Sequence, residues 1–330
     1  MNENNKNSST KYRIILCIVS FFLILTLLLH AFSVYCIKQA RKDPSKVADE
    51  DFAYIDILNQ PADTIDVIAI GDSESMSSIN NMAIWKDTGI TTYVSGEAGA
   101  VTAQCYYALK KAMENQTPDV VLLEANCLVQ AEGKFTGKEK ALDGILTYYF
   151  PGTHFHDVWK NEVPKDNVDR AYYKGMAIRP EIDPYTGGDY MIPTDEMAPM
   201  PIVERFYFNK IRKLCQANNV HLLAYFVPAP SIHRYAMHNT MQAEAEKYGF
   251  DYIDFSLIDK EIGLDYSTDI LDGGDHVNLS GATKISNYLG KFMQEHYGLE
   301  SQQGDPAYAS WDQDYNSYEE EAKKSGCAAW

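Results

Sequence analysis

Residues 64–75 read TIDVIAIGDSES, an apolar run that ends at the polar stretch Gly71-Asp72-Ser73-Glu74-Ser75. The run is short and rich in β-branched residues, and a glycine follows it directly, so it predicts a strand and then a sharp turn. Because positions 67–70 are all apolar, the strand is expected to be buried on both faces, as in a parallel sheet covered by helices. The stretch therefore favours an α/β fold with a polar turn at the carboxyl end of a strand.

The chain beyond this turn alternates strand and helix patterns. Such alternation predicts one three-layer α/β/α domain with a parallel sheet, and ligands of such sheets bind at the carboxyl ends of the strands. The predicted strands are 64–70, 91–94, 120–124, 221–227 and 252–255, and the predicted helices are 78–86, 102–114, 202–217, 241–248 and 280–297.

A second polar segment, Leu271-Asp272-Gly273-Gly274-Asp275-His276-Val277-Asn278, stands before the last predicted helix. A serine hydroxyl becomes an effective nucleophile when an imidazole accepts its proton and a carboxylate orients that imidazole. Ser73, His276 and one of two aspartates, Asp272 or Asp275, could supply these groups. The pairing of Ser73 with His276 is the feature of the chain that points to a reaction.

Two further loops are expected at the same edge of the sheet. Gly96 and Gly99 follow the second predicted strand, and Asn126 follows the third by two residues. Each has an ordinary structural reading as well, since glycines permit turns with positive φ and asparagine caps helices. Their order and position, rather than any single residue, indicate a site.

These blocks resemble the SGNH hydrolase superfamily, also called GDSL esterases and lipases, which is named for a Ser, a Gly, an Asn and a His in four separated blocks. The resemblance covers roughly residues 64–296. Four segments carry it: Gly71-Asp72-Ser73, Ser95-Gly96-Glu97-Ala98-Gly99, Leu123-Glu124-Ala125-Asn126 and His276-Val277-Asn278-Leu279-Ser280-Gly281-Ala282.

The chain departs from the superfamily pattern in three places. Glu74 stands where the family has Leu, no Gly-Gly pair precedes Asn126, and position 273 is Gly where the family has Asp three residues before the His. We expect Asp272 to be the acid, because the side chain of a residue adjacent to His276 usually points away from it. Asp275 is the alternative acid.

The resemblance implies a role for each of these residues. Ser73 would attack an ester carbonyl, and His276 would take its proton and return it to the leaving group. The backbone N–H groups of Ser73 and Gly99 and the side-chain amide of Asn126 would stabilise the oxyanion. The chemistry needs no metal and no organic cofactor.

The N-terminal region contains 24 uncharged, mostly apolar residues from Ile14 to Ile37. At 1.5 Å per residue this segment is long enough to cross the roughly 30 Å hydrocarbon core of a bilayer. A cleaved signal peptide would have a shorter apolar stretch and a small-residue cleavage site, so an uncleaved transmembrane anchor is favoured. Basic residues flank the span on both sides, and we expect the main domain outside the cytoplasm because long domains are translocated largely regardless of charge.

Charge excludes one class of partner. Residues 51–330 carry 22 Lys and Arg against 42 Asp and Glu. This acidity argues against nucleic acid, because phosphate backbones are bound by basic patches. It also argues against a domain that lies flat on anionic lipid.

Composition divides the chain into five parts. We expect a short cytoplasmic tail at 1–13, the transmembrane anchor at 14–37, a linker at 38–60, the catalytic domain at 61–300 and an acidic, disordered tail at 301–330. Within the domain, residues 130–200 form an aromatic-rich insertion with weak periodicity, which is expected either to set specificity or to cover an edge of the sheet.

A single-pass anchor joined to such a domain also resembles the envelope branch of the superfamily, which acts with membrane-bound O-acyltransferases, as in teichoic-acid D-alanylation and alginate acetylation. The resemblance implies transfer or removal of a small acyl group, acetyl above all, on a cell-envelope polysaccharide. Water or a sugar hydroxyl would resolve the acyl-enzyme, and the sequence leaves both open. Two rivals are a non-catalytic membrane-anchored scaffold and a metal-dependent phosphoesterase that uses Asp72, Asp272, Asp275 and His276.

Overall fold

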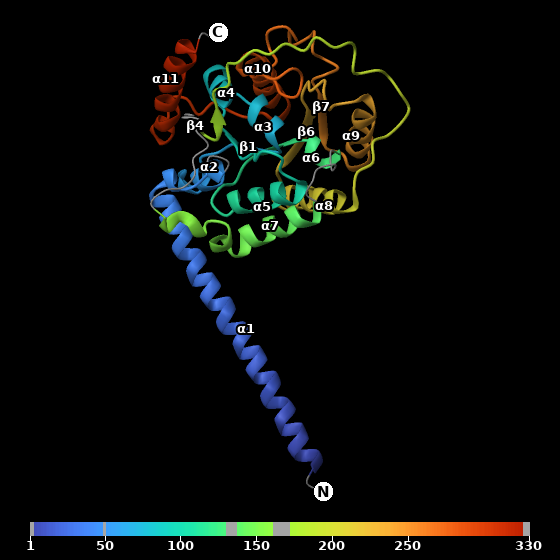
Figure 1. The fold of residues 1–330 in the computed structure, drawn as a ribbon. Coiled ribbons are helices and arrows are strands. Elements are labelled where there is room, and N and C mark those ends of the chain that lie inside the picture. Colours follow the sequence, from blue (N-terminus) through green and yellow to red (C-terminus); the bar gives the residue numbers. More distant parts are fainter. Residues whose placement is uncertain (1–2, 49–50, 130–136, 161–171, 326–330) are drawn as a thin grey trace.

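The computed structural model describes residues 3–48, 51–129, 137–160 and 172–325. A five-stranded sheet forms the centre of the domain, with the order β2-β1-β3-β6-β7 and every neighbouring pair parallel (Figure 1). Its strands are β1 (Val67–Ile70), β2 (Thr92–Val94), β3 (Val120–Glu124), β6 (His221–Phe226) and β7 (Asp251–Asp254).

This strand order is that of the flavodoxin-like doubly wound folds, and it reverses direction between β1 and β3. Ligands of open α/β sheets bind at that switch point, outside the carboxyl ends of the strands. Ser73 directly follows the turn after β1, and Asn126 comes two residues after the end of β3. The predicted α/β fold with a parallel sheet flanked by helices is therefore confirmed.

Helices cover both faces of the sheet because alternate strand residues point to opposite sides. Strand β1 shows the alternation, since Ile68 and Ile70 pack on one face of the sheet and Val67 and Ala69 pack on the other. The first face carries α2 (Phe52–Asp56), α5 (Thr102–Ala112), α8 (Ile202–Ala217) and α9 (Tyr235–Tyr248), and the second carries α4 (Asn81–Thr88), α10 (Leu279–Tyr297) and α11 (Ala309–Lys324).

The remaining elements are short or peripheral. The helices are α3 (Ser73–Ser78), α6 (Asn126–Val129) and α7 (Gly137–Tyr149), and β4 (Tyr172–Tyr173) pairs with β5 (Met176–Ala177) as a small antiparallel hairpin. Single 3-10 turns lie at Pro44–Lys46, Ile57–Asn59, Pro151–Thr153, His156–Trp159 and Pro306–Tyr308.

Most predicted elements match within a few residues, and two differ. The helix predicted over 78–86 is two helices, α3 and α4, because Asn80 caps a new start with its side chain accepting from the backbone N–H of Ala83. The helix predicted from residue 241 begins at Tyr235.

The N-terminal helix α1 (Glu3–Lys42) projects from the domain (Figure 1). Its segment Thr10–Lys42 has a mean hydropathy of 2.8 in its most apolar window, and none of that window is buried inside the protein. A long apolar helix is consistent with a membrane anchor or a signal sequence. The segment expected as a linker does not hang free, since Ile55, Ile57 and Leu58 are buried.

The predicted disordered tail is wrong for residues 309–324, which form α11. Trp311 and Tyr318 are buried, and the ring of Trp311 lies 5.6 Å from that of Trp85 on α4. The apolar side of α11 consists of Trp311, Tyr315, Tyr318 and Ala322, which recur at helical spacing among acidic residues. Scattered aromatic residues in a polar stretch had concealed this period.

The expected insertion is described only in part, because residues 130–136 and 161–171 lie outside the described residues. Residues 178–200 contain no helix or strand and run over the domain as the yellow-green segment of Figure 1. Their backbone bonds to the segment that precedes α10, with Asp183 N donating to Ile270 O and Gly273 N donating to Asp183 O. This part of the insertion therefore supports the loop that carries His276.

Candidate active site

Ser73 is the first residue of α3, at the carboxyl end of β1. The turn before it lies so close to β3 that a Cβ at Gly71 would stand 2.7 Å from Cβ of Glu124, so only glycine fits there. Asp72 then caps the helix, its carboxylate accepting from the backbone N–H of Glu74. Close approach and capping together fix where the Ser73 hydroxyl points.

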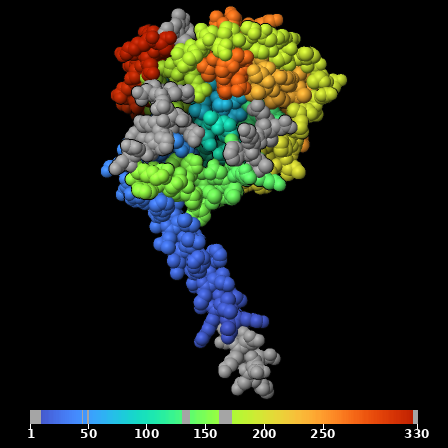
Figure 2. Space-filling view, in the orientation of Figure 1, coloured from blue at the N-terminus to red at the C-terminus, as the bar shows by residue number. Residues whose placement is uncertain are grey.

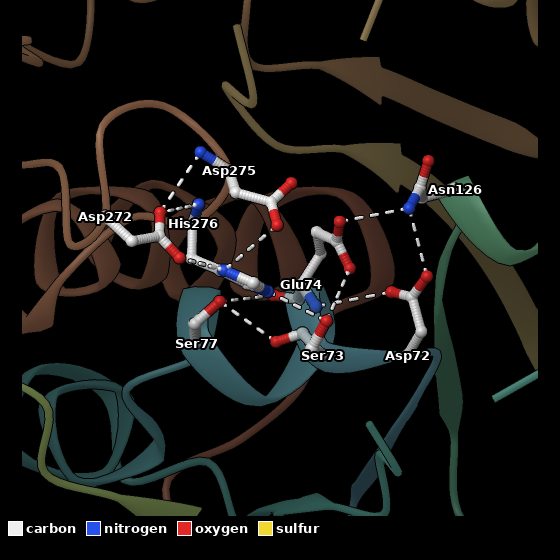
Figure 3. Close-up of polar contacts among 8 residues, drawn as sticks. All are labelled: Asp72, Ser73, Glu74, Ser77, Asn126, Asp272, Asp275 and His276. Atoms are coloured by element: carbon white, nitrogen blue, oxygen red, sulfur yellow. Dashed lines mark hydrogen bonds and ion pairs between the residues drawn. The ribbon is translucent and has the colours of Figure 1, made fainter. Parts of the chain in front are cut away.

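His276 reaches Ser73 from the other end of the chain (Figure 3). Its Nε2 lies 2.8 Å from Oγ of Ser73, and its Nδ1 lies 2.6 Å from Oδ2 of Asp272. Both distances are within hydrogen-bond range. A carboxylate on Nδ1 fixes the tautomer that leaves Nε2 as the proton acceptor, which is the arrangement of a serine nucleophile with its base.

The loop between Asp272 and His276 is closed by its own backbone. Oδ1 of Asp272 accepts from the N–H groups of Asp275 and His276, at 3.1 and 2.8 Å. Gly273 and Gly274 have φ of 76° and 125°, conformations that favour glycine. These two glycines let an aspartate four residues before the histidine fold back onto its ring.

The two candidate acids differ in distance. The nearer carboxylate oxygen of Asp275 lies 3.7 Å from Nδ1 of His276, more than 1 Å beyond that of Asp272. Burial tends to raise the pKa of Asp272, but the side-chain and backbone hydrogen bonds from His276, its charge and the backbone N–H of Asp275 together outweigh burial, so the pKa of Asp272 lies below the ordinary value. Geometry thus favours Asp272, and a catalytic role for it stays a prediction.

Asn126 lies near Ser73, but its side chain is committed elsewhere. Its Nδ2 donates to Oδ2 of Asp72 and to Oε1 of Glu74, both at 3.0 Å (Figure 3). A primary amide has two N–H donors, so this geometry uses both. The predicted oxyanion role of Asn126 would require at least one of these bonds to be exchanged for the substrate.

Glu74 joins the amide to the nucleophile. Its Oε2 lies 3.1 Å from Oγ of Ser73, and the residue is almost fully buried. Carboxylate oxygens of Asp72, Glu74 and Glu124 lie within 4.8 Å of one another. Burial and the neighbouring Asp72 raise the pKa of Glu74 to about 10. Burial and the neighbouring Asp72 and Glu74 raise the pKa of Glu124. Burial and the neighbouring carboxylates thus favour the neutral form of Glu74.

The two candidate glycines lie in different surroundings. A Cβ at Gly96 would stand 2.3 Å from Oγ of Ser75 and 3.2 Å from the carbonyl oxygen of Asp72, so this glycine packs on the turn that carries Ser73. Around Gly99 only the amino group of Lys140 comes within 4 Å of the same point, and that amino group donates to the Gly99 carbonyl. Gly96 therefore packs against Ser75 and the Asp72 carbonyl, and the oxyanion role of Gly99 stays a prediction.

The residues of the phosphoesterase alternative do not assemble into one group. Among the described residues, the acidic and histidine side chains close enough to share an ion fall into two sets, Asp272 with Asp275 and His276, and Asp72 with Glu74 and Glu124. Asp72 thus belongs to a different set from the other three residues of that alternative.

Comparison with known proteins adds a likeness of fold. No protein-family model and no curated protein sequence matches the chain. A solved structure of a Bacteroides fragilis protein, provisionally assigned as an acylhydrolase, covers 73% of this chain and 93% of its own length, with 11% identity and a TM-score of 0.40. That likeness concerns the course of the chain and gives no residue a role.

The sequence did not indicate that Glu74 and Glu124 belong to the buried carboxyl cluster beside Ser73. Glu74 stood out only as a departure from the superfamily pattern, and Glu124 only as the last residue of a strand. The signal was present in the run VVLLE, since an acidic residue that closes a strand buried on both faces must find a partner or a proton. Asn278, the last residue of the quoted segment, caps α10 through bonds from Ser280 and Gly281.

Proposed function

We propose that this chain is a membrane-anchored serine esterase or O-acyltransferase that acts outside the cytoplasm on small acyl esters, acetyl above all, of a cell-envelope polysaccharide. One observation carries the proposal, the continuous chain of hydrogen bonds from Ser73 through His276 to Asp272. These three side chains come from opposite ends of the sequence of the domain and meet at the carboxyl edge of the sheet.

The reaction proceeds in two steps. Oγ of Ser73 attacks the ester carbonyl while Nε2 of His276 takes its proton, and the imidazolium then protonates the leaving alcohol, which gives an acyl-serine. Water or a sugar hydroxyl attacks the acyl-serine next, with His276 again removing the proton. The Asp272 carboxylate holds the ring and stabilises its positive charge in both steps.

The surroundings of Ser73 favour a polymeric substrate. Ser73 is partly exposed, and α3 lies at the floor of a hollow on the face shown in Figure 2. Beside the His276 loop, an open cleft of about 450 Å³ is lined by Tyr185, Tyr190 and Tyr266 together with Lys260, carboxylates and backbone groups. Aromatic faces with polar neighbours are suited to stacking on sugar rings. The cleft adjoins the loop of His276, because the Tyr185 ring lies against Gly274.

The proposal places α1 in the membrane and the domain on the extracytoplasmic side. A membrane-bound O-acyltransferase that delivers the acyl group belongs to the same proposal. If such a partner loads Ser73, the chain is the second carrier of a relay, and the sugar hydroxyl is the natural acceptor. Without it, water resolves the acyl-serine, and the chain removes acyl groups.

The test uses the full chain in detergent with p-nitrophenyl acetate and a fluorophosphonate probe. We expect steady hydrolysis and labelling of Ser73, both lost in Ser73→Ala, with hydrolysis also lost in His276→Ala. Ser77→Ala is the matched control, because that hydroxyl lies one turn along the same helix and donates to the Ser73 carbonyl. Hydrolysis that survives Ser73→Ala contradicts the mechanism, and a folded protein that neither hydrolyses nor labels supports the scaffold alternative.

A further inference from the structure

A cleft opens where α1 meets the underside of the domain. It is an open space of about 820 Å³ between the C-terminal part of α1, the end of α7 and the surface of α5. Val34, Ile37 and Lys38 line it from α1, and Lys111, Tyr148 and Tyr149 line it from the domain. None of these residues belongs to the site around Ser73.

The length of α1 sets the height of this cleft above the membrane centre. Arg13 is the last charged residue before the apolar segment, and about 20 residues of helix cross the roughly 30 Å hydrocarbon core. The upper boundary of that core therefore falls near Ser33 and Val34. Lys38 stands about 6 Å higher along the helix, at the level of lipid headgroups.

The domain meets α1 at this same height. The backbone N–H of Gly152 donates to Oγ of Ser33 at 3.0 Å. A Cβ at Gly152 would lie 2.8 Å from the Phe32 ring and 2.9 Å from Cα of Ser33, so the two backbones are in close contact. No spacer separates the predicted hydrocarbon boundary from the folded domain. Its lowest elements must therefore lie among the headgroups when α1 spans a bilayer.

The lining of the cleft changes from apolar to cationic in the direction of the domain. Val34 and Ile37 come first along α1, and the exposed Lys38 follows. On the opposite wall Lys110 lies over the Tyr148 ring, 4.4 Å from its centroid. Lys111 adds a second ammonium group on that wall. Aromatic rings with cations are typical of the membrane interface.

The charge of the cleft opposes that of the rest of the domain. Residues 51–330 carry 20 more acidic than basic residues, whereas Lys38, Arg41, Lys110 and Lys111 gather here. Glu114, which pairs with Lys111 at 2.6 Å, is an acidic group on the same face. Arg41 is held by the Leu58 carbonyl and the Asn59 side chain, and Lys111 shares its ammonium group with Glu114. Lys38 is therefore the cation best placed to receive an anion, with Lys111 facing it across the cleft.

We propose that this juxtamembrane cleft binds the headgroup of an anionic glycerophospholipid, with the phosphate between Lys38 and Lys111 and the acyl chains along Val34 and Ile37. The proposal rests on the anchor part of the proposed function and is independent of the reaction at Ser73. It revises the expectation that the acidic domain avoids anionic lipid, because the contact is local and uses a cationic face that adjoins α1.

The test uses the full chain in nanodiscs of equal parts phosphatidylglycerol and phosphatidylcholine. Lipids that remain bound after mild detergent extraction are counted by native mass spectrometry. We expect phosphatidylglycerol to be enriched on the wild type, and the Lys38→Gln/Lys111→Gln double variant to lose the enrichment, about fivefold for each cation removed. Lys260→Gln/Lys291→Gln, two exposed lysines away from α1, is the matched control and keeps it.

The outcomes separate this proposal from the anchor. A chain that fails to enter nanodiscs contradicts the anchor itself. A chain that enters them but retains both lipids equally, or loses phosphatidylglycerol equally in both double variants, overturns the headgroup site. Equal thermal melting of the variants shows that neither result comes from unfolding.

Discussion

The hydroxyl of Ser73 lies between two partners, Nε2 of His276 at 2.8 Å and Oε2 of Glu74 at 3.1 Å. It has a single proton to donate. An ionised Glu74 would compete with the imidazole for that proton, whereas a neutral Glu74 donates its own proton to Oγ and leaves the serine proton to His276. Oε1 of Glu74 already accepts from Asn126, so a proton on Oε2 is the one that could be donated to Oγ. The raised pKa of Glu74 and the hydrogen-bond pattern thus agree.

We expect Glu74 to act as a neutral hydrogen-bond donor, so that Glu74→Gln and Glu74→Leu differ. The glutamine keeps a donor of similar shape and should hold kcat/KM within about tenfold of the wild type, while the leucine, which the superfamily pattern has at this position, should lose about 10²–10³ if the donor serves the oxyanion. Ester hydrolysis measures both. If Glu74→Gln abolishes turnover at neutral pH, the group acts as a carboxylate base instead.

Glu74→Gln should also change how the stability of the fold depends on pH. In the folded protein the pKa of Glu74 is about 10, above its ordinary value of 4.5. The contribution of Glu74 to the stability of the fold is therefore fully present below pH 4.5 and is lost as the pH rises toward 10. Glutamine does not ionise, and the melting temperature of Glu74→Gln should therefore exceed that of the wild type by a margin that widens between pH 5 and pH 9. A margin that stays constant with pH would show that the carboxyl is ionised throughout.

The choice of acid is tested by Asp272→Asn and Asp275→Asn. The Asp272 carboxylate accepts a hydrogen bond from Nδ1 of His276 at 2.6 Å, while the nearer carboxylate oxygen of Asp275 lies 3.7 Å from the same nitrogen. Losing the orienting carboxylate should lower kcat by about 10²–10⁴ with little change in KM, because the imidazole takes the wrong tautomer. Asp275→Asn should stay within about threefold of the wild type. The reverse ranking would restore Asp275 as the acid of the triad.

The two glycines of the second block are separated by Gly96→Ala and Gly99→Ala. A methyl group at position 96 would collide with the buried Ser75 and displace the turn that holds Ser73, so both activity and melting temperature should fall. At Gly99, whose φ is 64°, the cost is backbone strain of about 1 kcal/mol in an open place, and hydrolysis should persist. If Gly99→Ala is the variant that loses turnover while it remains folded, the original assignment of the oxyanion glycine is right.

The sequence predicted the sheet well, because its five strands are apolar runs bounded by turn residues. It also predicted that Ser73, Asn126 and His276 lie at one edge of the sheet, since parallel strands bring their carboxyl ends together. It did not predict the carboxyl cluster of Asp72, Glu74 and Glu124. Hydrogen-bond partners and shared protons depend on distances of a few tenths of an ångström, which no residue pattern carries.

The C-terminal helix shows a second limit. Composition identified residues 301–330 as acidic and polar, and that is correct for the outer side of α11. Composition does not register that Trp311 and Tyr318 are seven residues apart and thus on one side of a helix. Two large aromatic residues are enough to dock a short helix when a matching surface exists, and α4 supplies it with Trp85.

Trp311 should accordingly contribute to the stability of the whole domain. It is 2% exposed, and Trp311→Ala should lower the free energy of unfolding by about 3–5 kcal/mol. Trp159, which is 62% exposed, is the matched control, and Trp159→Ala should change stability by less than about 0.5 kcal/mol. Chemical denaturation measures both. Equal effects of the two substitutions would show that α11 is only loosely attached to the domain and does not stabilise it.

Asp254, at the end of β7, gives the domain a defined sensitivity to acid. Burial tends to raise its pKa, but hydrogen bonds from His233 and His238 outweigh it and lower the pKa to about 2. A depressed carboxyl pKa stabilises the fold above the ordinary value of 3.8 and ceases to do so as the pH falls toward 2. At pH 6 the free energy of unfolding of the wild type should exceed that of Asp254→Asn by about 2 kcal/mol, measured by chemical denaturation. This difference should shrink between pH 4 and pH 2. An unchanged difference at pH 3, or the same shrinkage with the exposed Asp195→Asn, would mean that Asp254 is not the group that titrates.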